Sequence, residues 1–85
     1  MSSAREGQDT ERTLAQLAPG EGGVVARLEG DPLVVRRLME LGLTPGTPVE
    51  LVRRAPLGDP VELRVRDVSL SIRRSEAARI HVAAR

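Results

Sequence analysis

The sequence predicts a mainly β protein: a small, strongly bent barrel of about five short strands, with one helix and a short C-terminal helical turn. Segments of alternating apolar and polar residues recur in the second half of the chain. Tight-turn signals built on Pro-Gly or Asp separate them. Every inward position is Val, Leu, Ile or Ala, because the chain has no aromatic residue. Short strands with tight turns suit a barrel, whereas a flat sheet would leave its edges exposed.

Residues 1–13 contain only Met1 and Ala4 as apolar residues. Such a segment buries too little apolar surface to be ordered, so we expect a disordered N-terminal tail ahead of a single domain, residues 14–85. The tail lacks the apolar stretch of a secretory signal. No apolar run in the chain approaches the roughly 18 residues of a membrane-spanning helix, so we expect no direct membrane insertion.

The domain is expected to open with a turn, in which Gly20 takes the positive φ of a type II turn. A strand is predicted next, over residues 23–29. The glycines of Glu21–Gly23 are interpreted as a flexible turn, because the spacing of a phosphate-binding loop is missing.

Residues 32–41 are predicted to form the helix. Asp31 is a suitable N-cap, and Pro32 suits the first helical position. Gly42 stands where a residue with positive φ ends a helix, followed by Leu43 in contact with Leu38, as in a Schellman motif. The buried stripe is expected to consist of Val34, Leu38 and Leu41, helped by Val35.

Four further strands are predicted, over residues 48–54, 60–66, 68–74 and 79–83. A turn containing Gly46 precedes the first of them, and Asp67 occupies a tight turn between the second and third. Ser75 is expected to cap a helical turn that ends at Ala78. Alternation assigns ten residues to the interior: Val49, Leu51, Val61, Leu63, Val65, Val68, Leu70, Ile72, Ile80 and Val82.

Composition excludes several kinds of function. The absence of Cys removes disulfides, thiolate metal sites and Cys nucleophiles, and it is consistent with a cytoplasmic protein. The absence of Phe, Tyr and Trp removes the aromatic groove that binds polyproline and the platforms on which bases stack. All thirteen basic residues are Arg, and the net charge of +1 is low for a nucleic-acid-binding domain, so we expect no nucleic acid partner.

Few residues suggest catalysis or metal binding. His81, the only histidine, is expected to point outward as a solvated strand residue, and with nearby carboxylates it would form at most a weak metal site. Asp59, Glu62 and Asp67 lie near one hairpin, but the aliphatic interior leaves no evident pocket for a catalytic pair. We therefore expect a protein that is not an enzyme and has no cofactor, no catalytic residue and no metal-ligand residue.

Four segments together resemble the FeoA family. They are Leu14–Val25 (LAQLAPGEGGVV), Arg36–Thr47 (RRLMELGLTPGT), Ala55–Pro60 (APLGDP) and Leu70–Ile80 (LSIRRSEAARI). The resemblance covers residues 14–85. It implies an SH3-like barrel and an accessory role beside FeoB, a membrane transporter with a cytoplasmic GTPase domain. It carries over no catalytic or metal-ligand residues.

The resemblance also implies an alternative and one departure. The same module occurs in DtxR-type metal-dependent repressors behind a winged helix, for which this chain has no room, so we expect the transport role. Many relatives have Gly where Asp67 stands, and Asp tolerates the left-handed region that such a turn requires. A nucleic-acid-binding or metal-responsive regulatory module remains the alternative function.

The loop Ala55–Pro60 is the main candidate for partner binding. Pro56 and Gly58 suit the second and fourth positions of a type I turn, so the loop is expected to be stiff. Leu57 at its tip either covers the barrel end or contacts a partner. Three pairs of adjacent basic residues occur in the chain: Arg36–Arg37, Arg53–Arg54 and Arg73–Arg74. They form plain surface, a protein interface or a phosphate-binding stripe. The candidate partner-binding residues are Arg53, Arg54, Pro56, Leu57 and Asp59, with Arg36 and Arg37, while Gly20, Gly42, Gly46 and Gly58 are structural.

Overall fold

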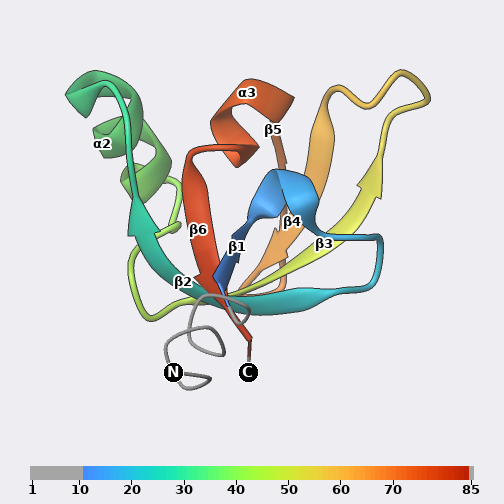
Figure 1. The fold of residues 1–85 in the computed structure, drawn as a ribbon, viewed down its shortest axis with the longest axis horizontal. Coiled ribbons are helices and arrows are strands. Elements are labelled where there is room, and N and C mark those ends of the chain that lie inside the picture. The colour runs from blue at the N-terminus through green and yellow to red at the C-terminus, as the bar shows by residue number, and fades with distance from the viewer. Residues whose placement is uncertain (1–10, 85) are drawn as a thin grey trace, which may run out of the picture.

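The computed structural model describes residues 11–84, which form one six-stranded antiparallel sheet in the order β1-β6-β2-β3-β4-β5. The sheet bends strongly on itself and carries its helices along one side (Figure 1). The mainly β prediction is confirmed. The elements are β1 (Glu11–Thr13), the 3-10 helix η1 (Leu14–Gln16), β2 (Gly22–Leu28), α2 (Pro32–Glu40), β3 (Pro48–Arg54), β4 (Val61–Val65), β5 (Val68–Ile72), α3 (Arg74–Ala77) and β6 (Ile80–Ala83).

Strand β1 corrects the predicted extent of the tail. Residues 11–13 pair with β6, with Glu11 opposite Ala83 and Thr13 opposite His81. No strand was predictable here, because the three residues are polar and the strand depends on a partner at the other end of the chain. The rest of the expected tail, residues 1–10, lies outside the described residues.

Two irregularities bend the sheet. The register shifts in β2 between Val25 and Arg27, and in β3 between Leu51 and Arg53. Such bulges increase the local twist of a strand. The bulge in β2 also explains why its sequence shows no strict alternation.

Gly22 and Gly23 lie inside β2, so their interpretation as a flexible turn is wrong. A Cβ on Gly22 would lie 2.6 Å from the backbone oxygen of Val49, and a Cβ on Gly23 would collide with that of Ala83. The two glycines therefore allow β2 to pass close to β3 and β6.

The core lies inside the bent sheet and is aliphatic. Two residues expected there are exposed: Val68 is 56% exposed and Leu41 is 41% exposed. Val68 lies on β5, the last strand of the sheet, and Leu41 is the C-cap residue of α2. The buried apolar residues are Leu14, Leu17, Val25, Leu38, Leu43, Val49, Leu51, Val61, Leu63, Val65, Ile72, Ala77, Ile80 and Val82.

Both predicted ends of α2 are confirmed, although the helix ends one residue earlier, at Glu40. The side chain of Asp31 accepts a hydrogen bond from the Leu33 N–H at 2.8 Å. Gly42 has a φ of 105°. The Leu43 N–H donates to the Leu38 carbonyl at 3.2 Å, which is the long bond of a Schellman motif.

The N-cap of α3 is Arg73, and Ser75 lies within the helix, so the cap predicted at Ser75 is wrong. The carboxylate of Glu76 accepts a hydrogen bond from the N–H of Arg73 at 3.0 Å and so caps the start of α3 from within the helix. In a capping box, the side chain at the third helical position accepts a hydrogen bond from the N–H of the N-cap residue.

The predicted turn glycines adopt positive φ: 90° at Gly20, 92° at Gly46 and 87° at Gly58. Between β4 and β5, Arg66 and Asp67 have φ of 51° and 68°, so both residues of this two-residue turn are left-handed. Within residues 11–84, no helix is long and apolar enough to cross a membrane.

Candidate functional site

The loop Ala55–Pro60 joins β3 to β4 and is closed by two backbone hydrogen bonds. The Gly58 N–H donates to the Ala55 carbonyl at 2.7 Å, and the Ala55 N–H donates to the Pro60 carbonyl at 3.0 Å. The Asp59–Pro60 peptide is cis. Leu57 at the tip is 93% exposed, so it projects into solvent and does not cover the barrel end.

The loop is also fixed from outside. Asp59 Oδ1 accepts a hydrogen bond from the Arg74 N–H at 3.0 Å, which ties the loop to the start of α3. Arg53 Nε lies 2.7 Å from Glu62 Oε1 across the hairpin, while three quarters of the Arg53 side chain remains exposed. A shallow hollow of about 360 Å³ lies beside the loop, between residues such as Arg53, Pro56 and Glu62.

Arg54 has a different role from its neighbour. Its guanidinium donates to the backbone oxygen of Ala15 at 3.0 Å and to that of Leu17. These bonds hold η1 and the segment after it against the end of β3. Arg54 therefore satisfies partly buried backbone acceptors. Its contact with a partner stays an untested prediction.

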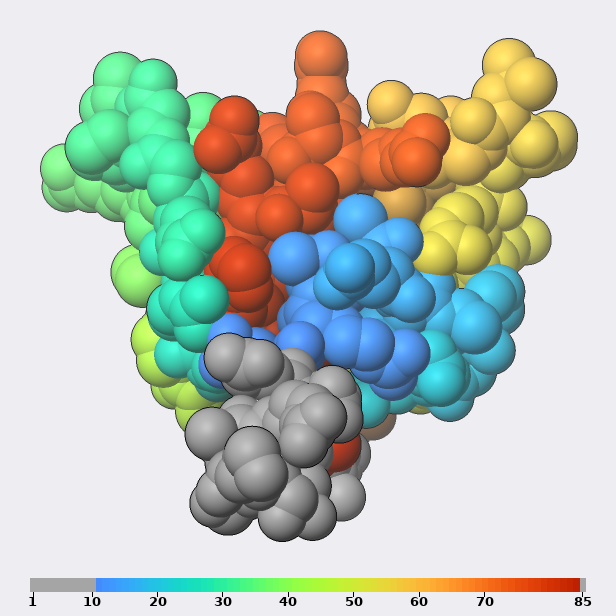
Figure 2. Space-filling model, viewed as in Figure 1, coloured from blue at the N-terminus to red at the C-terminus, as the bar shows by residue number. Residues whose placement is uncertain are grey.

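The other two predicted residues lie on α2. Arg36 is exposed and forms a pair with Glu40 at 3.7 Å, and Arg37 is bonded to Glu76 of α3. The loop and α2 stand on opposite sides of α3 (Figure 1). The space-filling view shows the three as separate projections with indentations between them (Figure 2). The predicted partner-binding residues thus form two surfaces.

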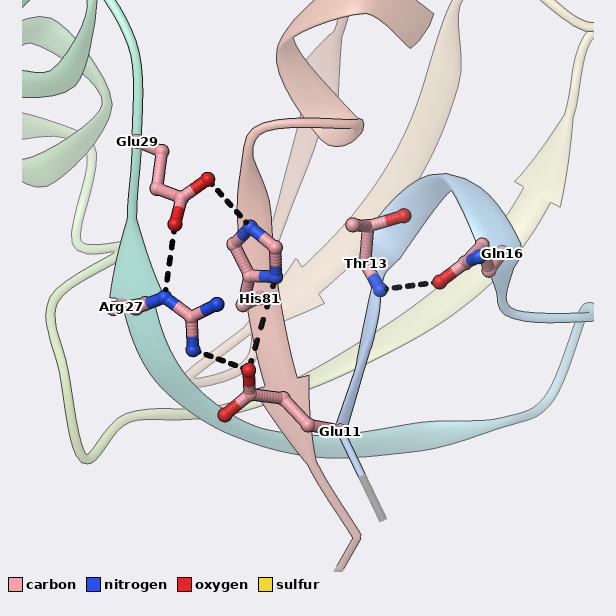
Figure 3. A network of polar contacts seen from close by, with 6 residues as sticks. All are labelled: Glu11, Thr13, Gln16, Arg27, Glu29 and His81. Carbon is pink, nitrogen blue, oxygen red and sulfur yellow. Dashed lines mark hydrogen bonds and ion pairs between the residues drawn. The ribbon is translucent and has the colours of Figure 1, made fainter. Parts of the chain in front are cut away.

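The polar network around His81 was not predicted (Figure 3). His81 Nε2 lies 3.1 Å from Glu29 Oε1, and its Nδ1 lies 3.9 Å from Glu11 Oε1. Arg27 Nε donates to Glu29 Oε2 at 3.0 Å, and Arg27 also contacts Glu11. The His81 side chain is only 19% exposed, so its interpretation as a solvated residue is wrong.

The charges in this network offset one another. Hydrogen bonds from Arg27, and then from His81, lower the pKa of Glu29. In return, hydrogen bonds to Glu29 and Glu11 raise the pKa of Arg27. The guanidinium of Arg27 thus contacts both carboxylates. No group of three His, Cys, Asp or Glu residues in residues 11–84 is arranged to hold a metal ion.

The three hairpin acids do not converge. Asp59 and Asp67 lie beyond opposite ends of β4, which spans Val61–Val65. Glu62, on β4, is paired with Arg53. The structure therefore separates Asp59 from Asp67, and it bonds Asp59 to the Arg74 N–H and Glu62 to Arg53.

The fold and these contacts define a small β-barrel module whose distinctive features are an exposed, preformed loop and charged surface residues. The FeoA domain model matches residues 12–84, and the chain belongs to the FeoA family. The family suggested by the sequence is thus confirmed.

Three relatives illustrate the similarity. The chain is 39% identical over 69 residues to a fusion protein of Porphyromonas gingivalis named Fe(2+) transport protein A/Fe(2+) transporter FeoB, covering 81% of this chain and 8% of the fusion protein. The solution structure of FeoA from Chlorobium tepidum is 39% identical, with a TM-score of 0.77, over 84% of this chain and 69% of that one. A zinc complex of FeoA from Stenotrophomonas maltophilia, described as a prokaryotic SH3 domain protein, is 32% identical, with a TM-score of 0.69, over 80% of this chain and 85% of that one. The SH3-like fold is therefore confirmed.

Proposed function

We propose that this protein is a non-enzymatic accessory of ferrous iron uptake, which docks on the cytoplasmic side of a FeoB-type GTPase transporter and modulates it. The observation that carries the proposal is the Porphyromonas gingivalis fusion protein, which is named for both components. A covalent link raises the effective concentration of one module beside another. A domain similar to this chain therefore works within reach of such a transporter. The proposal places this protein in the cytoplasm, at the membrane only through its partner.

The loop Ala55–Pro60 is the proposed docking point. Leu57 is an exposed apolar residue on a backbone that is already held by hydrogen bonds at Ala55, Gly58 and Asp59. Docking on a preformed loop costs little conformational entropy. Arg53 beside the loop keeps most of its side chain exposed and adds a polar contact at the rim.

A phosphate-binding stripe fits the Arg contacts less well. In two of the three basic pairs, Arg36, Arg37 and Arg53 are paired with Glu residues, and Arg54 is bonded to backbone oxygens. Neither residue of the third pair, Arg73 and Arg74, has an ion-pair partner among the described residues. An Arg that already has a partner must exchange it before it binds a phosphate. These pairs support the protein-docking function over nucleic acid binding.

The proposal is tested by co-purification of the full chain with a FeoB-type transporter from membranes, using matched leucine substitutions. Leu57→Asp should keep the fold and weaken binding by roughly 5- to 150-fold, as expected for a modest hot spot. Leu33→Asp is the matched control, because Leu33 is 77% exposed but lies on α2. Leu63→Asp, at a fully buried position, should unfold the domain. It therefore shows how far binding falls when the fold itself is lost.

Each result is decisive. If the wild-type protein recovers no transporter, the proposed function is wrong. If folded Leu57→Asp binds as well as the wild type, the loop is not the docking point. If Leu33→Asp alone loses binding, the docking surface lies on α2.

A further inference from the structure

We propose that the outer edge of β5 binds an extended acidic polypeptide segment, which adds to the sheet as a further strand. β5 is the last strand of the sheet and pairs with β4 alone (Figure 1). In residues 11–84 no other strand pairs with its outer edge. This inference concerns a different surface from the loop of the proposed function and stands without the transporter.

The register shows which backbone groups face outward. Val65 and Val68 are opposite each other and flank the two-residue turn. In such a hairpin this pair exchanges hydrogen bonds, and bonded pairs then alternate along the ladder. Val68, Leu70 and Ile72 therefore bond to β4, while Ser69 and Ser71 direct their N–H and C=O groups away from it. These are the groups that an added strand would bind.

The outer edge of β5 lacks several of the usual protections, and no backbone hydrogen bond from a loop or helix among residues 11–84 reaches Ser69 or Ser71. Natural edge strands are blunted by charged residues, proline, bulges or very short length. β5 reads Val-Ser-Leu-Ser-Ile, contains no charge or proline, and pairs with β4 without a register shift. Ser69 and Ser71 are exposed. By contrast β1, at the opposite edge of the sheet, has three residues, two of them charged.

Charge at the two ends of β5 indicates the chemistry of the partner. Arg66 precedes the strand, and Arg73 and Arg74 follow it. None of the three has an ion-pair partner among the described residues. Asp67 in the turn offsets one of these charges, and Asp59 is bonded to the Arg74 backbone. An acidic segment along β5 would therefore meet the Arg66 side chain at one end and the net positive charge of Arg73 and Arg74 at the other.

The same charges disfavour a second copy of this chain. In an antiparallel pair of β5 strands, Arg66 of one copy would lie beside Arg73 and Arg74 of the other. In a parallel pair, each Arg would lie beside its own counterpart. Like charges placed opposite each other destabilise strand pairing. The edge thus opposes self-association and favours an acidic strand.

The test uses the full chain and a labelled synthetic peptide, acetyl-Glu-Val-Glu-Thr-Glu-Val-Glu-amide, with a peptide carrying Lys in place of every Glu as the control. We expect the acidic peptide alone to bind, with affinity that falls as salt rises. NMR should show new protection of the Ser69 and Ser71 amide protons from exchange. Ser71→Pro should abolish binding, because it removes an outward N–H and spares the bonds to β4.

A second variant keeps the proposal falsifiable if Ser71→Pro does not fold. This double variant, Arg66→Asn with Arg74→Gln, keeps a residue at position 66 that tolerates left-handed φ. It should bind the acidic peptide at least tenfold more weakly than the wild type does. Arg36→Gln, on α2, should bind the peptide as the wild type does. Failure of the acidic peptide to bind, equal binding by folded Ser71→Pro, or a concentration-dependent dimer formed through β5 would each overturn the proposal. None of these results depends on recovery of the transporter.

Discussion

The carboxylate of Glu76 accepts a hydrogen bond from the guanidinium of Arg37 and so joins α3 to α2. The two residues are 39 positions apart in the sequence. Glu76 is 9% exposed, and its other oxygen accepts the Arg73 N–H. Leu38 is the only residue of α2 that is fully buried. Of the α2 residues, Leu38 belongs to the core and Val34 packs against it, so we expect the ion pair to add to a limited apolar contact.

We expect Glu76→Ala to lower the free energy of unfolding by about 1–3 kcal/mol, because it leaves the Arg73 N–H and the Arg37 guanidinium without their acceptor. Urea denaturation followed by circular dichroism measures the change. Glu40→Ala removes an exposed pair with Arg36 on the same helix and should cost only about 0.3–0.5 kcal/mol. Equal losses in the two variants would show that the link between α2 and α3 adds no stability.

Gly42→Val should cost roughly 1–2 kcal/mol or more, because a β-branched residue is strained at a φ of 105°. The strain is in the backbone, since the nearest atom to an added Cβ is Val65 Cγ1 at an ordinary 3.8 Å. Glu40→Val, inside the last helical turn, is the control and should cost only a few tenths of a kcal/mol. An unchanged melting temperature for Gly42→Val would contradict the Schellman end of α2.

Removal of residues 1–13 should destabilise the domain, in contrast to the expectation from sequence that this segment is a tail. The deletion removes β1 and its pairing with β6, together with the contact between Glu11 and Arg27. Removal of residues 1–10 leaves every described residue in place and is the matched control. We expect the longer deletion to melt roughly 4–8 °C below the shorter one, which corresponds to about 1 kcal/mol in a domain of this size. Identical melting temperatures would refute a stabilising role for β1.

Two carboxylates should make stability depend on acid pH. Hydrogen bonds lower the pKa of Glu29, first from Arg27 and then from His81, and lower the pKa of Glu21, first from the Ala18 N–H. A group whose pKa is lower in the folded chain contributes stability that is complete above its unfolded pKa and is lost as the pH falls through its folded pKa.

The loss should therefore appear below about pH 4 and stay small, because both side chains are well exposed. Urea unfolding between pH 6 and pH 3 measures it. Glu21→Gln and Glu29→Gln should each flatten the dependence of the free energy of unfolding on pH. Ser69→Ala changes no ionisable group and should follow the wild type. A steep wild-type slope retained in both Gln variants would assign the effect to other residues.

The sequence determined those features of the protein that depend on neighbours along the chain. The caps of α2 at Asp31 and Gly42 were predictable, because their hydrogen bonds span two to five residues. The positive φ at Gly20 and Gly46 followed from the chemistry of Pro-Gly turns, whereas Gly58 was predicted only as the fourth residue of its turn. Alternation placed most of the β-strand core correctly, because side chains on a strand alternate with a fixed period of two.

Only the tertiary structure decided which distant residues meet. β1 exists through pairing with β6, and His81 lies beside Glu11 and Glu29, which come from two other segments. Arg54 could not be told from Arg53 in the sequence, yet the bulge after Leu51 and the position of η1 direct it to backbone oxygens. The exposure of Leu57 and the free edge of β5 likewise depend on the order of strands in space. That order is set by the cooperative packing of one aliphatic core, and no local pattern encodes it.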